Sequence, residues 1–274
     1  MLLLLKEKME TLKELNKICQ KPEYKTKGNW MVRNITRDMA LPVSWLLLHT
    51  NITANQVTLF SLVIAGAACL MFGTGVKAAM LGGAVLLQLW YLLDHVDGHI
   101  ARYRGQSSLT GVYFDYITHY IVHAAIFIGI GVGIATDDGG STFLIMGFAA
   151  AFGVTFLNLV YDVMYKTYFF RLTKASVVTV RHDDIVADSM NTSASHIGIR
   201  QLFSFAHKLC EVHVLMNIVT LLAVVAFFFP VNPWKIFIIA YSFLCTGVGL
   251  FKNVHFILSK TPDKRLKKMF EVKD

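Results

Sequence analysis

Long apolar runs constrain the fold of this chain more than any other feature of its sequence. Hydrophobic residues make up 55% of its 274 residues and charged residues only 16%, whereas a soluble domain of this length carries roughly 25% charged residues. The apolar residues gather into runs long enough to cross a bilayer, which takes about 20 residues per helix. The sequence therefore predicts an integral membrane protein of the all-α class.

Six membrane-spanning helices are predicted from these runs. Their approximate ranges are 55–74, 77–100, 112–135, 142–168, 211–229 and 234–257. The apolar segment 36–49 is short and contains Pro42, so we expect a helix at the membrane surface there. Residues 1–50 should thus form interfacial helices, 51–260 a six-helix domain and 261–274 a basic cytoplasmic tail. Close helix packing is predicted at three glycines of the third span, Gly129, Gly131 and Gly133.

The N-terminal segment has the pattern of an amphipathic helix. Met9, Leu12, Leu15 and Cys19 recur at helical spacing among lysines, which suits a helix lying in the membrane interface. An amphipathic helix packed against the rest of the protein fits the same pattern. The first ten residues, MLLLLKEKME, lack the charge order of a secretory signal, because charges follow the apolar run.

Positive charges predict the orientation of the chain in the membrane. The connections after the first, third and fifth spans hold only Lys77 and Lys235, and the other lysines and arginines lie on the opposite side. By the positive-inside rule both termini then face the cytoplasm, in a cell or inner membrane. The net charge of +8 also favours contact with anionic lipid headgroups. No nucleic-acid partner is expected, because no separate basic face with interleaved aromatic residues is present.

Residues 94–119, DHVDGHIARYRGQSSLTGVYFDYITH, carry the chemistry of this sequence. Asp94 and Asp97 share one helix face at spacing i, i+3, and Asp115 and His119 share a face of the next helix at i, i+4. The short connection lets the two faces converge near the cytoplasmic membrane surface. Three carboxylates at membrane depth repel one another unless cations compensate them, so we expect hard divalent ions such as Mg²⁺.

Glycine and arginine side chains in the same hairpin favour phosphate binding. Gly98 and Gly111 let a backbone or a phosphate approach closely, and Arg102 adds a bidentate donor for phosphate oxygens. Taken singly, these residues also fit ordinary charged helix ends. Their combination in one hairpin predicts a metal-bridged diphosphate site. A transporter or channel is disfavoured, because the spans carry few charges away from their cytoplasmic ends.

This hairpin resembles the signature of the CDP-alcohol phosphotransferases, D-x2-D-G-x2-A-R-x8-G-x3-D-x3-D. Seven of its eight fixed positions match with every spacing kept, at Asp94, Asp97, Gly98, Ala101, Arg102, Gly111 and Asp115. The last position departs, with His119 in place of aspartate. Residues 52–58, ITANQVT, are similar to the ITPNQVT that opens the first span in the family, and residues 32–50 resemble the interfacial helix of bacterial members that make inositol-phosphate phosphodiesters.

The resemblance implies a membrane transferase that moves a substituted phosphoryl group from a CDP-linked donor to an alcohol and releases CMP. The donor would be CDP-diacylglycerol or a small CDP-alcohol, and the acceptor an alcohol or a lipid. Two divalent ions, Mg²⁺ or Mn²⁺, would be held at Asp94, Asp97, Asp115 and the fourth motif position. Donor contacts would come from Asn55, Thr58, Gly98, Ala101, Arg102 and Gly111. Family members are often dimers, so a homodimer is a further expectation.

His119 leaves several interpretations open. The family's carboxylate at this position is a metal ligand and the base that activates the acceptor hydroxyl. Histidine is chemically suited to act as this base, because its unperturbed pKa is near 6.5. As a ligand it offers one neutral nitrogen, so the second ion should bind more weakly and the preference should shift toward Mn²⁺ or Zn²⁺. Alternatively His119 only shapes the acceptor pocket, or the chain is an impaired relative that binds a CDP-lipid or acts as a scaffold.

Candidates for the acceptor side lie on the third and fourth spans. His123 is interpreted as a buried polar residue that could also contact substrate. Asp162 and Lys166, at i and i+4, would form an ion pair or line the acceptor cavity. Arg171 would hold an acceptor phosphate or merely follow the positive-inside rule. For two donor candidates on the first span, Asn55 and Thr58, the alternative is a helix N-cap.

Overall fold

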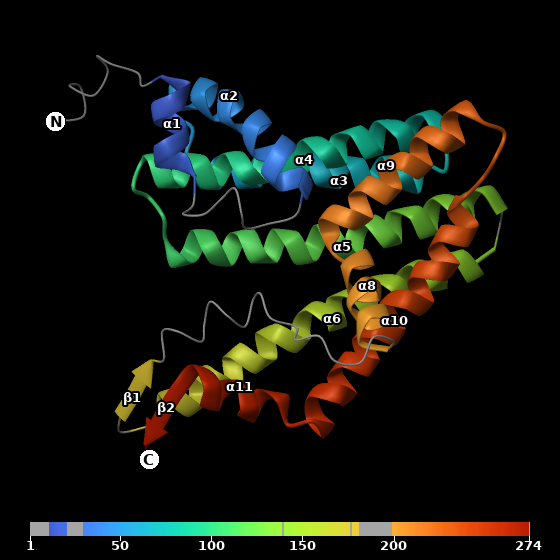
Figure 1. Cartoon of the computed structure of the whole chain (residues 1–274). Coiled ribbons are helices and arrows are strands. Elements are labelled where there is room, and N and C mark those ends of the chain that lie inside the picture. Colours follow the sequence, from blue (N-terminus) through green and yellow to red (C-terminus); the bar gives the residue numbers. More distant parts are fainter. Residues whose placement is uncertain (1–10, 21–29, 139, 176, 181–198, 274) are drawn as a thin grey trace.

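The computed structural model describes residues 11–20, 30–138, 140–175, 177–180 and 199–273 of the chain. Within these ranges it is a bundle of long helices (Figure 1). The helices are α1 Leu12–Cys19, η1 Val32–Thr36, α2 Arg37–Leu48, α3 Ala54–Gly73, α4 Lys77–Tyr103, α5 Leu109–Asp138, α6 Thr142–Leu172, α8 Ile199–Leu209, α9 Val212–Phe228, α10 Trp234–Leu258 and α11 Thr261–Met269.

The predicted helical membrane fold is confirmed. Five described helices, α3, α4, α5, α6 and α10, are long and apolar enough to cross a membrane. A sixth span arises when α8 and α9, which are bent by 65° at a short break, are taken together. The α9 helix ends at Phe228, shortly before Pro230, because proline cannot continue the helical hydrogen bonding. The α2 helix is not among the described helices that pass the length and composition test.

Local capping fixes the start of α3 beside the end of α4. Thr53 is the N-cap of α3: its hydroxyl accepts from the Gln56 amide, and the Gln56 side chain accepts from the Thr53 amide at 2.8 Å. This capping box satisfies two backbone donors that the first turn leaves free. Arg104, just after α4, donates to the carbonyl oxygens of Ile52 at 2.6 Å and Thr50 at 2.7 Å. The segment that opens α3 is therefore tied to the α4–α5 connection.

Glycines let α5 approach its neighbours closely, as the sequence predicted. A Cβ atom on Gly129 would lie 2.6 Å from the carbonyl oxygen of Cys69 in α3, and one on Gly131 would lie 2.9 Å from that of Phe143 in α6. A Cβ atom on Gly133 would overlap the backbone of α3 as well. Small residues permit this approach of helix backbones inside a membrane.

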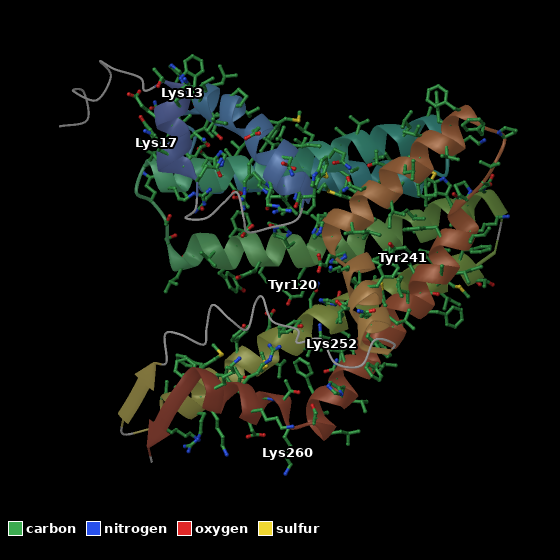
Figure 2. The ribbon with its side chains drawn as sticks, in the orientation of Figure 1. Lys13, Lys17, Tyr120, Tyr241, Lys252 and Lys260 are labelled. Carbon is green, nitrogen blue, oxygen red and sulfur yellow. The ribbon has the colours of Figure 1, made fainter. Side chains whose placement is uncertain are left out.

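The α1 helix packs against the protein, which is one of the two arrangements that its pattern allowed. Leu15 and Cys19 are buried, and the Cys19 thiol donates to the carbonyl oxygen of His99 in α4 at 3.5 Å. Lys13 and Lys17 point away from the bundle (Figure 2). The docking face of α1 therefore reaches the end of α4, where the signature begins. Met9, which belongs to the predicted pattern, lies outside the described residues.

The C-terminal segment forms more structure than a basic tail. After α11, strand β2 Phe270–Lys273 pairs antiparallel with β1 Val177–Val180, and Val177 stands opposite Lys273. The sequence predicted neither strand. The pairing joins the segment after α6 to the end of the chain, so part of the 169–210 connection is ordered by a contact that is distant in sequence.

The connections lie at two opposite ends of the bundle. Figure 1 has α1, the α4–α5 connection and the β1–β2 pair at one end, and the α3–α4, α5–α6 and α9–α10 connections at the other. At this second end, the Lys77 ammonium donates to the carbonyl oxygen of Phe229 at 3.2 Å, and Lys235 lies 5.8 Å from the ring centroid of Phe143. The signature hairpin thus sits at the same end as α1 and β2.

The close α3–α5 contact gives a testable consequence. Gly129→Ala should lower the free energy of unfolding by about 1–3 kcal/mol, because the added methyl group must push α3 away from α5. Gly66→Ala on α3 is the matched control, since a Cβ atom there meets no heavy atom within 4 Å. Thermal unfolding of both variants in detergent tests this, and equal melting temperatures would contradict it.

Candidate functional site

The signature hairpin forms one wall of a cavity of about 420 Å³. The start of α3, the end of α4, the α4–α5 connection and the start of α5 all contribute to its lining. Nine residues that the sequence predicted for the site lie on its wall: Asn55, Thr58, Asp94, Asp97, Gly98, Ala101, Arg102, Gly111 and Asp115. The converging helix faces expected from the spacing are therefore present.

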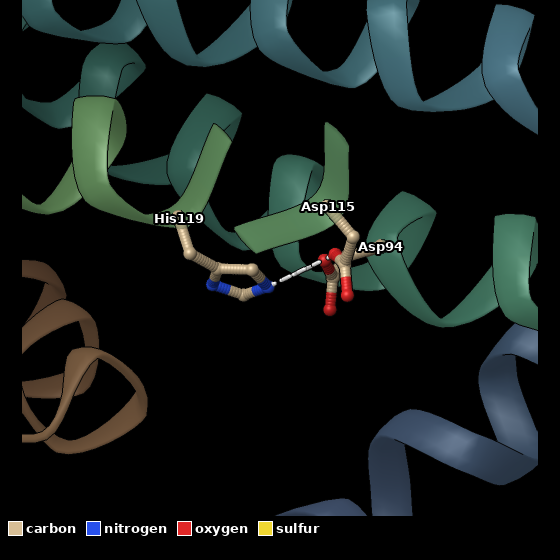
Figure 3. Close-up of side chains that lie close together, drawn as sticks. All are labelled: Asp94, Asp115 and His119. Carbon is tan, nitrogen blue, oxygen red and sulfur yellow. Dashed lines mark ion pairs between the residues drawn. The ribbon is translucent and has the colours of Figure 1, made fainter. Parts of the chain in front are cut away.

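His119 joins two of the aspartates from the edge of this cavity. Its Nε2 lies 2.8 Å from Asp94 Oδ1 and 3.4 Å from Asp115 Oδ1 (Figure 3). The imidazole also stands edge-on to the ring of Trp90, with the ring centroids 5.4 Å apart. Because Asp94 belongs to α4 whereas Asp115 and His119 belong to α5, these contacts link the two helices of the hairpin.

Asp97 is held from α3 rather than by the hairpin itself. The hydroxyl of Thr58 donates to Asp97 Oδ2 at 2.6 Å and lies 3.1 Å from the carbonyl oxygen of Ala54. Both side chains of this hydrogen bond are buried. The N-cap of α3 is Thr53, so Thr58 and Asn55 do not serve as the helix caps that the sequence left open. This hydrogen bond fixes Oδ2 of Asp97.

The side chains at this cavity suit a divalent ion. Asp94, Asp115 and His119 each offer one ligand atom, and these three atoms lie within 4.8 Å of one another. Asp97 lies one helical turn after Asp94 on α4. Carboxylate oxygens are preferred ligands of Mg²⁺, and imidazole nitrogen adds affinity for Mn²⁺ or Zn²⁺. The Thr58 hydroxyl also orients Asp97, as groups hydrogen-bonded to metal ligands commonly do.

Arg102 and the signature glycines provide a surface suited to phosphate. The Nε of Arg102 donates to the backbone carbonyl of Cys19 at the end of α1. A Cβ atom on Gly98 would lie 3.1 Å from Nη1 of the same guanidinium, so the guanidinium lies directly over the backbone there. A Cβ atom on Gly111 would lie 3.5 Å from the side-chain oxygen of Asn55. A methyl group at Gly98 would press against the Arg102 guanidinium, whereas one at Gly111 would meet Asn55 at ordinary contact distance.

The four residues predicted for the acceptor side do not line this cavity: His123, Asp162, Lys166 and Arg171. His123 is buried, as predicted. Its Nδ1 lies 3.4 Å from the amide nitrogen of Asn158 in α6, and its Nε2 has no hydrogen-bond partner in the described part of the chain.

The predicted ion pair between Asp162 and Lys166 is wrong. Asp162 instead accepts a hydrogen bond from the hydroxyl of Tyr120, which extends from α5 toward α6 (Figure 2). The Lys166 ammonium lies 6.0 Å from the ring centroid of Phe170. The i, i+4 spacing permits an ion pair along α6, but the tyrosine of the neighbouring helix occupies the carboxylate.

Sequence reasoning missed the part of the wall that the N-terminal elements supply. Gln20 at the end of α1 and Arg37 at the start of α2 both line the cavity. Nearby, Nδ1 of His99 lies 2.9 Å from the hydroxyl of Ser44 in α2. No local pattern marks Gln20. The resemblance of residues 32–50 to a family segment was the available signal for Arg37.

Comparisons with known proteins show which folds and sequences this chain is similar to. The crystal structure of a Mycobacterium tuberculosis phosphatidylinositol phosphate synthase with CDP-DAG bound has a similar fold, with a TM-score of 0.53 at 17% identity over 81% of this chain and 92% of that chain. A bifunctional IPC transferase and DIPP synthase of Rubrobacter xylanophilus is 38% identical over 93 residues. These residues are 33% of this chain and 20% of that protein, so the match spans about a fifth of the curated relative.

A family model described as CDP-alcohol phosphatidyltransferase matches residues 51–245. The matched stretch is more than half of the chain and contains the whole hairpin from Asp94 to His119. This chain therefore belongs to the CDP-alcohol phosphatidyltransferase family.

Proposed function

We propose that this protein transfers a substituted phosphoryl group from a CDP-linked donor to the hydroxyl of an alcohol acceptor. The reaction, of EC 2.7.8 type, would release CMP and form a phosphodiester in phospholipid or polyol-phosphate biosynthesis. The observation that carries this proposal is the convergence of Asp94, Asp97 and Asp115 on one cavity, with His119 in contact with two of them. Membership of the family supports the same class of reaction.

The carboxylates of Asp94, Asp97 and Asp115 would hold the divalent ions, Mg²⁺ or Mn²⁺. When bound, such ions neutralise the diphosphate of the donor and stabilise charge on the attacking and leaving oxygens. Arg102 would donate to a phosphate oxygen from its position over Gly98. Phosphoryl transfer relies mainly on positioning and on electrostatic stabilisation, and the side chains of this cavity would supply both.

His119 is the proposed proton acceptor. The acceptor oxygen would attack the phosphorus distal to cytidine while its proton passes to Nδ1 of His119, the ring nitrogen that does not face the carboxylates, and the bond from that phosphorus to CMP breaks. The carboxylates of Asp94 and Asp115, 2.8 and 3.4 Å from Nε2, would stabilise the resulting imidazolium. A ring nitrogen that ligates a metal cannot accept this proton, so a pure ligand role for His119 is a distinct alternative.

The donor side and the acceptor side would lie on different faces of α5. Asn55, Thr58, Gly98, Ala101, Arg102 and Gly111 all border the cavity and are proposed to contact the donor. CDP-diacylglycerol is the first donor to test, because the Mycobacterium tuberculosis relative was solved with CDP-DAG bound. The acceptor would be held by residues outside the cavity, with the candidates His123, Asp162, Lys166 and Arg171.

A cytoplasmic position of the site is supported by the distribution of charge. The signature hairpin lies at the end of the bundle that also carries α1 and the basic helix α11 (Figure 1). The opposite end holds Lys77 and Lys235. By the positive-inside rule, the end rich in lysine and arginine faces the cytoplasm. Both termini and the active site would then lie on that side.

Turnover by the purified protein tests the proposed class directly. Protein supplied with CDP-diacylglycerol or a small CDP-alcohol, a lipid or polyol acceptor, and Mg²⁺ or Mn²⁺ should release CMP, and chelation of the metal should abolish this. Absence of CMP with every acceptor would contradict the proposal. Binding of CDP without turnover would support the alternative, a catalytically impaired relative that binds a CDP-lipid or acts as a scaffold.

Substitution of His119 separates its proposed roles. His119→Ala should lower kcat by roughly 100-fold or more, the usual contribution of a general base. His119→Asp should retain turnover and need less divalent ion, because it restores one negative charge. Turnover is measured against metal concentration, with His255→Ala, on the exposed end of α10, as the matched control. Normal kcat at saturating metal in His119→Ala would rule out the base, and a raised metal requirement in the same variant would indicate a ligand.

The hydrogen bond from Thr58 to Asp97 should matter for metal affinity. Thr58→Val keeps the shape of the side chain but removes the hydroxyl, and loss of such a supporting contact typically costs about tenfold or more in metal affinity. Mn²⁺ titration followed by electron paramagnetic resonance measures this. Thr155→Val is the control, since that hydroxyl donates to the carbonyl oxygen of Ala151 at 2.8 Å, within α6. Equal Mn²⁺ affinity in the Thr58 variant would show that Asp97 does not depend on it.

A further inference from the structure

One ring nitrogen of His119 lies against a carboxylate oxygen from each helix of the hairpin. Nε2 is 2.8 Å from Oδ1 of Asp94 in α4 and 3.4 Å from Oδ1 of Asp115 in α5 (Figure 3). Ionised carboxylates only accept hydrogen bonds, so Nε2 carries the hydrogen that these contacts require. A ring nitrogen that carries a hydrogen has no lone pair to give to a metal ion. His119 therefore acts as a donor to the two carboxylates and not as a metal ligand beside them.

Packing from α4 holds the imidazole in this place. The ring of Trp90 stands edge-on to it, with the ring centroids 5.4 Å apart, and Trp90 is fully buried. Trp90 precedes Asp94 by one helical turn, so both lie on the same face of α4. The side chain of His119, which comes from α5, is thus fixed against α4 by an indole ring and a hydrogen bond.

Hydrogen bonds within the chain limit how many ions the three aspartates can hold. Oδ1 of Asp94 and Oδ1 of Asp115 both face Nε2 of His119. Oδ2 of Asp97 accepts from the Thr58 hydroxyl at 2.6 Å. Each aspartate therefore has one oxygen engaged by a neighbouring side chain. Mg²⁺ is commonly held by one or two carboxylates together with waters and substrate phosphates, so the other oxygens suffice for one ion.

A second ion would lack both negative charge and ligand atoms. Two-ion sites hold their ions about 3.5–4 Å apart, and two dications that close repel each other unless negative charge surrounds both. The family signature has four aspartates, whereas this chain has three and carries His119 at the fourth position. The side chains of His119 and Asp115 are 29% and 43% exposed, so ions can reach this position. The limit is therefore set by ligands and charge rather than by access.

We infer that this protein works with a single divalent ion and that His119 takes the place of the second ion. The one ion would be held by Asp94, Asp97 and Asp115. The inference rests on the proposed function, which it deepens by giving the number of ions that accompany the donor. In place of a second cation, the Nε2–H group of His119 partners the carboxylates, and Nδ1 on the other side of the ring remains the proton acceptor.

Counting the Mn²⁺ ions bound in the presence of CDP tests this on the full-length protein. Electron paramagnetic resonance measures the free Mn²⁺ during a titration, and spin coupling between bound ions reveals a close pair. The wild-type protein should bind one Mn²⁺ per chain without spin coupling. His119→Asp, which supplies a fourth carboxylate, should bind two spin-coupled Mn²⁺ ions. A parallel titration of CDP alone corrects for ions bound to free nucleotide.

The matched control is His255→Asp, which adds the same charge on an exposed side chain at the end of α10. This variant should bind one ion, as the wild-type protein does. A spin-coupled pair in the wild-type protein would overturn the inference without reference to any variant. One ion in His119→Asp would also overturn it, because the histidine would not be what excludes the second ion. A second ion in His255→Asp would do so as well, because added charge anywhere would then suffice.

Turnover separates a failure of this inference from a failure of the proposed function. One bound Mn²⁺ with no CMP released from any donor would contradict the proposed function and would still support the ion count. CMP release by a wild-type protein that holds a spin-coupled pair would do the reverse. A wild-type protein that binds no Mn²⁺ in the presence of CDP would contradict both.

Discussion

The site depends on the compensation of negative charge on three carboxylates, which lie at the ends of two membrane-spanning helices. Asp94 and Asp97 lie on α4 and Asp115 on α5, all on the wall of one cavity. Grouped negative charges at membrane depth are costly unless they are paired. His119 contacts two of them and Thr58 donates to the third. The charge that remains favours cations at this position, and the donor, metal and acceptor proposals all follow from it.

The rest of the fold holds these three carboxylates in position. The capping box at Thr53 and the hydrogen bonds of Arg104 hold the start of α3 beside the hairpin, so that the Thr58 hydroxyl reaches Asp97. Farther along the bundle, Gly129 allows α5 to approach α3 closely. At the other side, Gln20 after α1 and Arg37 of α2 line the cavity. Replacement of the last signature aspartate by His119 alters the charge of the site while these supports remain.

Much of this architecture could be predicted because the bilayer imposes strong rules on sequence. The apolar runs indicated the spans, and the spacing of Asp94, Asp97 and Asp115 indicated that their faces would converge. What escaped prediction depends on contacts distant in sequence. Gln20 reaches the cavity only because α1 docks on α4, and the β1–β2 pair joins segments that no local pattern connects. Asp162 was expected to pair along its own helix, whereas Tyr120 reaches it from α5.

The central claim is that the aspartates of the α4–α5 hairpin form a metal-dependent site for a CDP-linked donor. Anomalous X-ray scattering from Mn²⁺ in crystals grown with CDP tests it most directly. We predict Mn²⁺ bound to carboxylate oxygens of Asp94, Asp97 and Asp115, with the diphosphate of CDP beside it. Bound CDP with Mn²⁺ located elsewhere, or with no Mn²⁺ at the hairpin, would contradict it.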